Sequence, residues 1–393
     1  MKYLELETDP LVKDFLRSRT LRKTTEKVYV RRIKKYSKFL GKTPTEFIDE
    51  AEEEQDKGIK RRKRQINSYI YDFVELLKSE NHSAYSIKSN VETIVSFYKQ
   101  FDVDTPSLRN LLKNQNKNVS FETLLNKDQI KQIVDQANVR DKALILIHFS
   151  SGMGASEVRH LTFRDFLIAV GEYININELD KQDALKVAIN LKNRDDLIGT
   201  WKIHRFKTGM PYVTFTSPEA TKAIINYIID RYRTNKPIKS LDDVLIVNQS
   251  NKKLSATGYT LIFARLNEKL ELGRRSGKIR SFTSHILRKM FTTTLYQAGL
   301  DKLAIDWMLG HKIDPVTEAY FKTNIADLKR NYTKVLHHLT LEKVKIQRIE
   351  SNEVKDIVRD LDKKDKEIKM LRKENAMTQK IVKDLIETMK MRE

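Results

Sequence analysis

One stretch decides how the chain is interpreted: residues 284 to 320, which read SHILRKMFTTTLYQAGLDKLAIDWMLGHKIDPVTEAY. Its first part predicts a helix, because Thr283 or Ser284 can cap free backbone amides. Its apolar residues also fall on one helical face, and Gly299 can follow the helix end. His285 and Arg288 are three residues apart, so they share a second face.

Two more short helices are predicted to follow. Asp301 is a candidate N-cap for the first, and Gly310 would end it, which leaves His311 just beyond a helix end. Asp314 followed by proline is a start signal for the next helix, with Tyr320 inside its first two turns. An arginine, two histidines and a tyrosine hydroxyl are thus delivered together. Attack of a phenolic oxygen on a phosphate uses such a set without metal or cofactor.

The ordered set of His-x-x-Arg, Leu-Gly-His and a tyrosine nine residues after the second histidine resembles the C-terminal signature of the tyrosine recombinases (phage integrase family). The overall pattern is similar to archaeal-type integrases of mobile elements. The resemblance implies a mainly α fold with a small antiparallel β-sheet, built from a helical core-binding domain and a catalytic domain. It also implies double-stranded DNA as partner, with neither cofactor nor metal.

In that family the tyrosine attacks a DNA phosphate and forms a 3′-phosphotyrosyl link. By resemblance, Tyr320 is the nucleophile, and Arg288 stabilises charge on the phosphate. His285 acts as a base or phosphate contact, and His311 positions the same phosphate. Lys207 is the expected general acid, because Lys207-Thr208-Gly209 lies between two strand-like segments, 200–203 and 212–215. Residues 173–177 also alternate like a strand. Tyr332 is a competing nucleophile, but it lies beyond the family's usual spacing.

The first catalytic arginine of the family is missing. A segment resembling Ser-Gly-Met-x-x-Ser-Glu-Val should carry it after Gly152-Met153, where this chain has Gly154. Arg159, five residues later, is the nearest substitute. Five residues turn about 140° around a helix, so Arg159 needs a changed backbone path to reach the same place. The alternative is that Arg159 is a surface residue and that the site has lost an arginine. Ser156 is a candidate cap for the helix that follows.

Composition favours a polyanionic partner. Lys plus Arg number 74 against 53 Asp plus Glu, a net charge of +21 over 393 residues. No run of about 18 apolar residues and no signal peptide occurs, so we expect a soluble, cytoplasmic, nucleoid-associated protein without membrane contact. The absence of cysteine excludes disulfides, and with only 8 histidines it disfavours structural zinc.

The chain is predicted to contain a helical DNA-binding domain (1–112), a linker (113–123), a catalytic domain (124–338) and a C-terminal coiled coil (339–393). In the first domain and the linker, cationic residues are candidates for phosphate contacts, although a solvated charged face would explain them too. These candidates are Arg31, Lys35, Arg61, Arg62, Lys63, Arg64, Lys113 and Lys117.

The tail carries heptads. Val354, Leu361 and Ile368 recur every seven residues, and Asn375 continues the series at a position that often sets register. Self-association is the expected use, with a tetramer on DNA. The alternative is a solvated helix that packs on its own protein. For the whole chain, the prediction is a site-specific recombinase or integrase. The alternatives are an enzyme like a type IB topoisomerase and a catalytically impaired DNA-binding protein.

Overall fold

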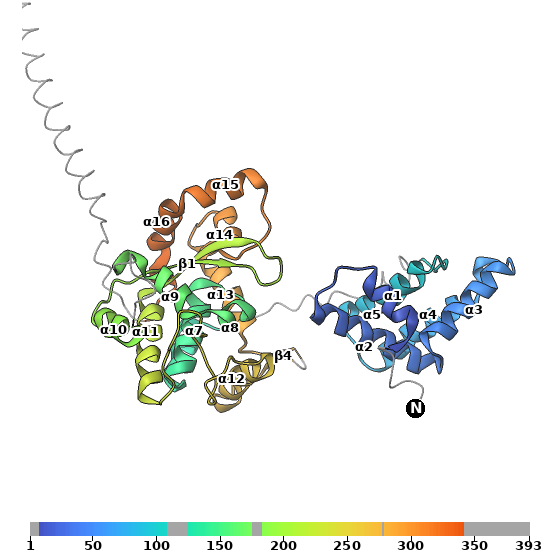
Figure 1. Cartoon of the computed structure of the whole chain (residues 1–393), viewed down its shortest axis with the longest axis horizontal. Coiled ribbons are helices and arrows are strands. Elements are labelled where there is room, and N and C mark those ends of the chain that lie inside the picture. Colours follow the sequence, from blue (N-terminus) through green and yellow to red (C-terminus); the bar gives the residue numbers. More distant parts are fainter. Residues whose placement is uncertain (1–7, 108–123, 175–182, 277–278, 342–393) are drawn as a thin grey trace, which may run out of the picture. The chain divides into compact units, whose positions relative to one another are not determined.

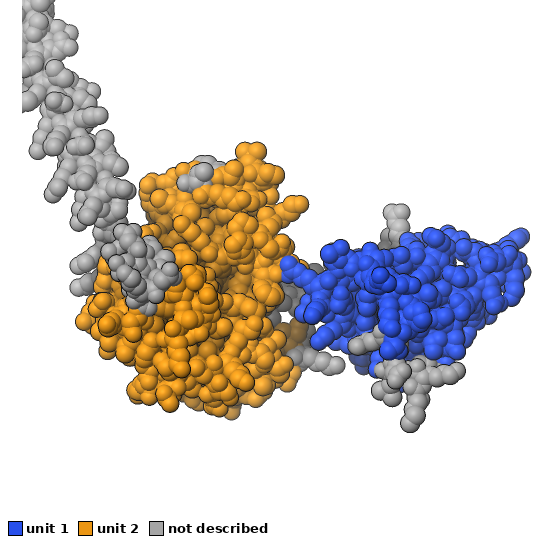
Figure 2. Space-filling model, viewed as in Figure 1, with its two compact units in different colours: residues 1–121 blue, residues 122–393 orange. Residues whose placement is uncertain are grey.

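The chain folds into two compact units, residues 1–121 and 122–393 (Figure 2). The computed structural model describes residues 8–107, 124–174, 183–276 and 279–341. These residues are mainly helical, with two small antiparallel strand pairs, as predicted (Figure 1). The division between the units falls inside the predicted 113–123 linker; the predicted domain limits themselves stay predictions. The predicted coiled coil lies outside the described residues from 342 onward.

Unit 1 is a helical bundle around an aromatic core. Its elements are α1 (Pro10–Arg17), α2 (Lys23–Leu40), α3 (Pro44–Asp56), the 3-10 turn η2 (Arg61–Lys63), α4 (Gln65–Ser79) and α5 (Ala84–Gln100). The ring of Tyr36 is fully buried and meets Phe47 and Phe73 edge-on, with centroids 5.3 and 5.0 Å apart. Such edge-to-face pairs add to the gain from burying apolar surface.

Unit 2 holds the other elements. They are α6 (Lys127–Gln136), α7 (Val139–Ser151), α8 (Ala155–His160), α9 (Phe163–Ala169), η3 (Gly171–Tyr173), α10 (Ala184–Leu191), β1 (Gly199–His204), β2 (Pro211–Thr216), α11 (Pro218–Arg233), α12 (Ala256–Lys269), β3 (Arg274–Ser276), β4 (Ile279–Arg280), α13 (Ser284–Gln297), α14 (Lys302–Met308), α15 (Pro315–Thr323), α16 (Ile325–Val335) and η5 (Leu336–His338).

Helix α7 is the centre of unit 2. Every residue from 143 to 151 is buried, so the helix has no solvent face over that stretch. Helices α11 and α13 and strand β2 pack against it. Because α7 is held from several sides, its C-terminal end is a fixed reference point for the elements that meet there.

The hairpin predicted around Lys207 is confirmed. β1 and β2 pair antiparallel from Gly199 opposite Thr216 to His204 opposite Pro211. Gly209 has φ +74° in the turn, a region that glycine enters without steric cost. The strand predicted over 173–177 is wrong at its start, because Tyr173 ends the 3-10 turn η3. Its remaining residues, 175–177, lie outside the described ones.

The predicted starts of the three helices from 284 to 320 are confirmed. Thr283 accepts a hydrogen bond from the backbone of Ile286, and Asp301 accepts one from Ala304. Asp314 accepts from the amide of Thr317 at 3.0 Å. The predicted cap at Ser156 is wrong, because α8 begins at Ala155 with Gly154 in the cap position. The glycine supplies no side-chain cap bond, and its backbone alone makes the turn out of α7.

Candidate active site

The turn between α7 and α8 is where the site is assembled. Four successive carbonyl oxygens, those of residues 150 to 153, accept hydrogen bonds from four side chains: Tyr332 of α16, Thr214 of β2, Arg288 of α13 and His148 of α7. Gly152 has φ +64°, and a Cβ there would lie 2.3 Å from the Phe291 ring. Glycine therefore lets α13 approach closely enough for Arg288 to reach the turn.

Arg288 bridges this turn to the end of α14. Its Nη1 donates to the carbonyl of Gly152 at 2.5 Å and its Nη2 to the carbonyl of Leu309 at 2.6 Å. Burial lowers the pKa of Arg288 to about 10, and the positive charge of Arg205 acts in the same direction. The group is still charged at neutral pH. No hydrogen bond to a carboxylate is seen for it within the described part of the chain.

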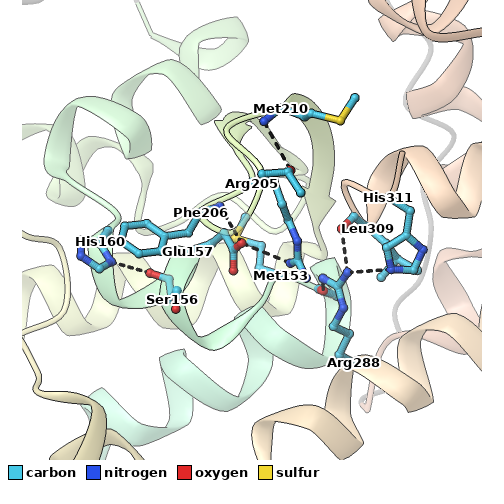
Figure 3. Close-up of polar contacts among 12 residues, drawn as sticks. Met153, Ser156, Glu157, His160, Arg205, Phe206, Met210, Arg288, Leu309 and His311 are labelled. Atoms are coloured by element: carbon cyan, nitrogen blue, oxygen red, sulfur yellow. Dashed lines mark hydrogen bonds and ion pairs between the residues drawn. The ribbon is translucent and has the colours of Figure 1, made fainter. Parts of the chain in front are cut away.

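His311 lies beside Arg288, as the sequence predicted for a residue just past a helix end. Its Nε2 is 3.2 Å from Nη2 of Arg288 (Figure 3). Its Nδ1 is 2.8 Å from Oδ1 of Asp306. Because Arg288 can only donate, Nε2 accepts and the proton sits on Nδ1, facing the carboxylate. Asp306 thus fixes the ring orientation. Sequence reasoning missed it, although its place five residues before a site histidine on a short helix was a usable signal.

The β1–β2 hairpin supplies further groups. Lys207 is exposed in the turn, without a recorded hydrogen bond or ion pair among the described residues. Two residues before it, Arg205 pairs with Glu157 of α8 at 3.1 Å, and Oε1 of Glu157 also accepts from the amide of Phe206 at 3.0 Å. The Phe206 ring stacks on His160 with centroids 4.5 Å apart. Helix α8 therefore anchors the base of the loop that carries Lys207.

The remaining predicted catalytic residues are less closely grouped. His285 is exposed at the start of α13, one turn before Arg288. Arg159 lies near Tyr259 of α12, where its charge opposes the rise that burial gives the pKa of that phenol. Its Nε is buried and lacks a hydrogen-bond partner in the described ranges. No recorded contact joins Arg159 to Arg288. Tyr320 belongs to α15, but its side chain lies outside the described residues.

The competing nucleophile is unsuited to the task. Tyr332 is fully buried on α16, and its hydroxyl donates to the carbonyl of Ser150 at 2.7 Å. Burial raises the pKa of this phenol, so the phenolate is disfavoured. Without a path for solvent or DNA to its oxygen, Tyr332 serves the core and holds the end of α7.

In unit 1 the predicted DNA-binding residues divide into two kinds. Arg31, Arg62 and Lys63 are exposed and show no bond to another described group. Arg64 is only 9% exposed and donates to the carbonyl of Ile59 and to Gln55, with Asp104 at 3.4 Å. Arg61 donates to the carbonyl of Thr105, and Lys35 pairs with Glu80. Lys113 and Lys117 lie outside the described residues.

Taken together, Arg288 and His311 form an oriented pair in unit 2. Carbonyls fix Arg288, Asp306 orients His311, and Lys207 is exposed in the turn of the β1–β2 hairpin. Positioned donors of this kind stabilise charge on a phosphate undergoing substitution. None of the described helices has the length and apolarity to cross a membrane, and no group of three potential metal-ligating side chains occurs in the described ranges.

Comparison with known proteins confirms the resemblance. The model of the phage integrase family matches residues 123–326, more than half of the chain. The chain belongs to this family. It is a tyrosine-type site-specific recombinase acting on DNA, an enzyme that cleaves and rejoins DNA strands.

Relatives and solved structures agree with this assignment. Tyrosine recombinase XerD of Oceanobacillus iheyensis is 23% identical over 67% of this chain and 80% of its own length. XerD of Staphylococcus aureus is 21% identical over 83% of this chain and 98% of its own. The Tn1549 transposon integrase, solved in complex with transposon right end DNA, shares the fold, with TM-score 0.50 and 18% identity over 81% of this chain and 98% of that one.

Proposed function

We propose that this recombinase cleaves DNA through a 3′-phosphotyrosyl intermediate formed by Tyr320. The phenolic oxygen attacks the phosphorus, a new P–O bond forms to the tyrosine, and the bond to the 5′ oxygen breaks. Lys207 gives its proton to the leaving 5′ oxygen, and His285 takes the phenolic proton or contacts the phosphate. The link retains the energy of the phosphodiester bond, so the free 5′ hydroxyl can attack it and rejoin the strands.

The hydrogen bonding of the Arg288 guanidinium is the observation that supports the proposal most directly. Two backbone carbonyls and His311 fix its guanidinium, yet no carboxylate hydrogen-bonds to it among the described residues. Carbonyl dipoles orient a guanidinium without neutralising it, so its charge is available to the non-bridging oxygens of a phosphate. His311 contacts Arg288 from the side of α14, where it can meet the same phosphate.

The test is covalent capture. Wild-type protein is incubated with a pool of nicked duplexes of random sequence, in which the short fragment released by cleavage diffuses away and prevents rejoining. Protein-linked DNA is then measured on denaturing gels. We expect attachment in the wild type and none in Tyr320→Phe, with DNA binding retained. Tyr296→Phe is the matched control, because this tyrosine is 66% exposed on α13. Attachment that persists in Tyr320→Phe would refute the nucleophile.

We also propose that the protein self-associates through the heptads of 339–393 and acts as a tetramer on double-stranded DNA in the cytoplasm, at the nucleoid. Recombination exchanges strands between two duplexes and needs several protomers, which supports this proposal. A lambda integrase fragment has been solved as a dimer bound to a core site. Light scattering should give more protomers per particle for the full chain than for a chain ending at 341; equal numbers of protomers would contradict a role for the tail. Kinship with archaeal-type integrases stays a prediction.

A further inference from the structure

The space beside Gly154 is already occupied. Gly154 has φ −78° and ψ 161°, a conformation open to any residue, so backbone geometry does not require glycine there. A Cβ at this position would lie 2.2 Å from Oε2 of Glu157 and 2.9 Å from Nη1 of Arg205. Glycine is therefore explained by the Glu157–Arg205 ion pair, which fills the volume that a side chain at 154 would enter.

Arg205 is held firmly at that place. Its backbone N–H donates to the carbonyl of Met210 at 2.7 Å, and its carbonyl accepts from Gly209 at 2.7 Å, which closes the hairpin turn. Its guanidinium pairs with Glu157 at 3.1 Å; the two side chains are 19% and 4% exposed. Figure 3 shows Arg205 extending from the hairpin toward Glu157 and Arg288. Because both the backbone and the guanidinium of Arg205 are held, the side chain loses little conformational entropy when it binds an anion.

Both guanidinium groups meet the α7–α8 turn: Arg288 donates to the carbonyl of Gly152, and Nη1 of Arg205 lies beside Gly154, two residues later. After burial, the charge of Arg205 is the largest influence that lowers the pKa of Arg288, while Glu157 acts against it. Like charges in a partly buried site repel, and one carboxylate offsets only one of them. An anion bound by both arginines would remove this repulsion. A phosphate with two charged non-bridging oxygens suits two forked donors.

We propose that Arg205 supplies the guanidinium that Gly154 lacks, and that it contacts the DNA phosphate at which Tyr320 acts. This inference rests on the proposed function. Glu157 is then a positioning residue, since it holds both the Arg205 side chain and the Phe206 amide. Arg205 is favoured over Arg159, because its Nη1 would lie 2.9 Å from a Cβ at position 154, where the family's arginine is expected, and Arg159 is not among the atoms that meet this Cβ.

The experiment measures single-turnover cleavage of a nicked duplex recovered from the capture pool. Arg205→Ala should slow cleavage about 100-fold, the usual loss when one charge-stabilising donor is removed. On a second substrate, a methyl group replaces one non-bridging oxygen of the cleaved phosphate and removes its negative charge. The ratio between wild type and Arg205→Ala should then fall toward one. A purely structural role would give the same ratio on both substrates.

Two further variants keep the outcome clear. Arg205→Lys retains the charge and the pairing with Glu157 but lacks the forked donor geometry, so an intermediate rate is expected even if Arg205→Ala disturbs the hairpin. Arg164→Ala is the matched control, because this arginine is partly exposed on α9 and pairs with Asp242. We expect it to cleave like the wild type on both substrates.

The inference is overturned if Arg205→Ala cleaves like the wild type, or if its defect is the same on the charged and the neutral phosphate. It is also overturned if Arg159→Ala, rather than Arg205→Ala, loses its defect on the neutral substrate. These results are separate from a failure of the proposed function, which would appear as wild-type protein that forms no attachment through Tyr320.

Discussion

Two largely covered arginines, one in each unit, are used in opposite ways. Arg64 of unit 1 comes from the densest basic run of the chain, yet it donates to Ile59 and Gln55 and lies near Asp104, all in its own unit. Arg288 of unit 2 is bound by two carbonyls and a histidine, and no carboxylate pairs with it among the described residues. Arg64 therefore interacts with groups of its own unit and stabilises the fold, whereas the charge of Arg288 remains available to a ligand.

Exposure completes the comparison. Arg231 of α11 is also bound by carbonyls, those of Lys236, Val244 and Leu245, but it is 2% exposed. No anion can reach it. Arg288 is partly exposed at the meeting point of α13, α14 and the α7–α8 turn. Arg288 is therefore a candidate phosphate ligand, because it remains open to solvent and no carboxylate hydrogen-bonds to it among the described residues. The density of basic residues in the sequence does not decide this.

The largest effect is expected at Arg288. Arg288→Ala should reduce cleavage at least 100-fold, about 3 kcal/mol in the barrier, because the phosphate loses a fixed donor. Arg288→Lys should lie between this variant and the wild type, since it keeps charge without the fork. Single-turnover cleavage measures the rates, and the fluorescence of Trp201 and Trp307, both buried in unit 2, checks that the unit is folded. A rate within about threefold of the wild type would contradict the role.

The second prediction distinguishes two kinds of arginine in the basic run of unit 1, those bonded within the unit and those exposed to solvent. Arg64→Ala should lower the unfolding free energy of unit 1 by about 2 kcal/mol, because a buried arginine and its hydrogen bonds to Ile59 and Gln55 are lost. Arg62→Ala should leave stability within about 0.5 kcal/mol. If Arg62 contacts a phosphate, Arg62→Ala should weaken DNA binding. It should also reduce the slope of the logarithm of the DNA-binding constant against that of the salt concentration by about 1. Hydrogen exchange of unit 1 and binding at several salt concentrations measure these quantities; equal stabilities for both variants would end the distinction.

A smaller effect concerns His148, which lies beneath the same turn as Arg288. Burial lowers its pKa from the ordinary 6.5 to about 4, and the charge of Arg288 adds to this. Between pH 6.5 and about pH 4, His148 is protonated in the unfolded chain but remains neutral in the folded one. Stability is therefore complete above pH 6.5 and falls as the pH drops toward 4. The loss from pH 7 to pH 5 should be about 2 kcal/mol.

His148→Gln tests this pH dependence, because glutamine can still donate to the carbonyl of Met153 and accept from Tyr259 without titrating. Urea unfolding followed by tryptophan fluorescence should show a shallower loss between pH 7 and pH 5 in this variant. An unchanged slope would assign the pH dependence to other groups.

The sequence predicted those features that depend on neighbouring residues. Helix starts at Thr283, Asp301 and Asp314 follow from local capping, and the hairpin at Lys207 follows from strand alternation around a glycine turn. Where local signals were ambiguous, the predictions were wrong. Ser156 has a capping side chain but lies inside α8, since the chain already leaves α7 through Gly152 in the left-handed region.

The partners of the site could not be predicted in the same way. Glu157 meets Arg205 across 48 positions, and Arg288 reaches Gly152 across 136. Such contacts depend on how α7, α8, α13 and the hairpin pack. Spacing made Tyr332 a weak competitor, but only its burial shows that its oxygen is already bonded inside the core.

By itself the sequence determined the family, the order of the motif residues and the absence of an arginine at position 154, because these are properties of residue identity and spacing. The tertiary structure alone decided which cations keep their charge available and what fills the volume beside Gly154. The reason is physical: the charge available from a guanidinium depends on the carboxylates, carbonyls and solvent around it. Packing brings those groups together from distant parts of the chain.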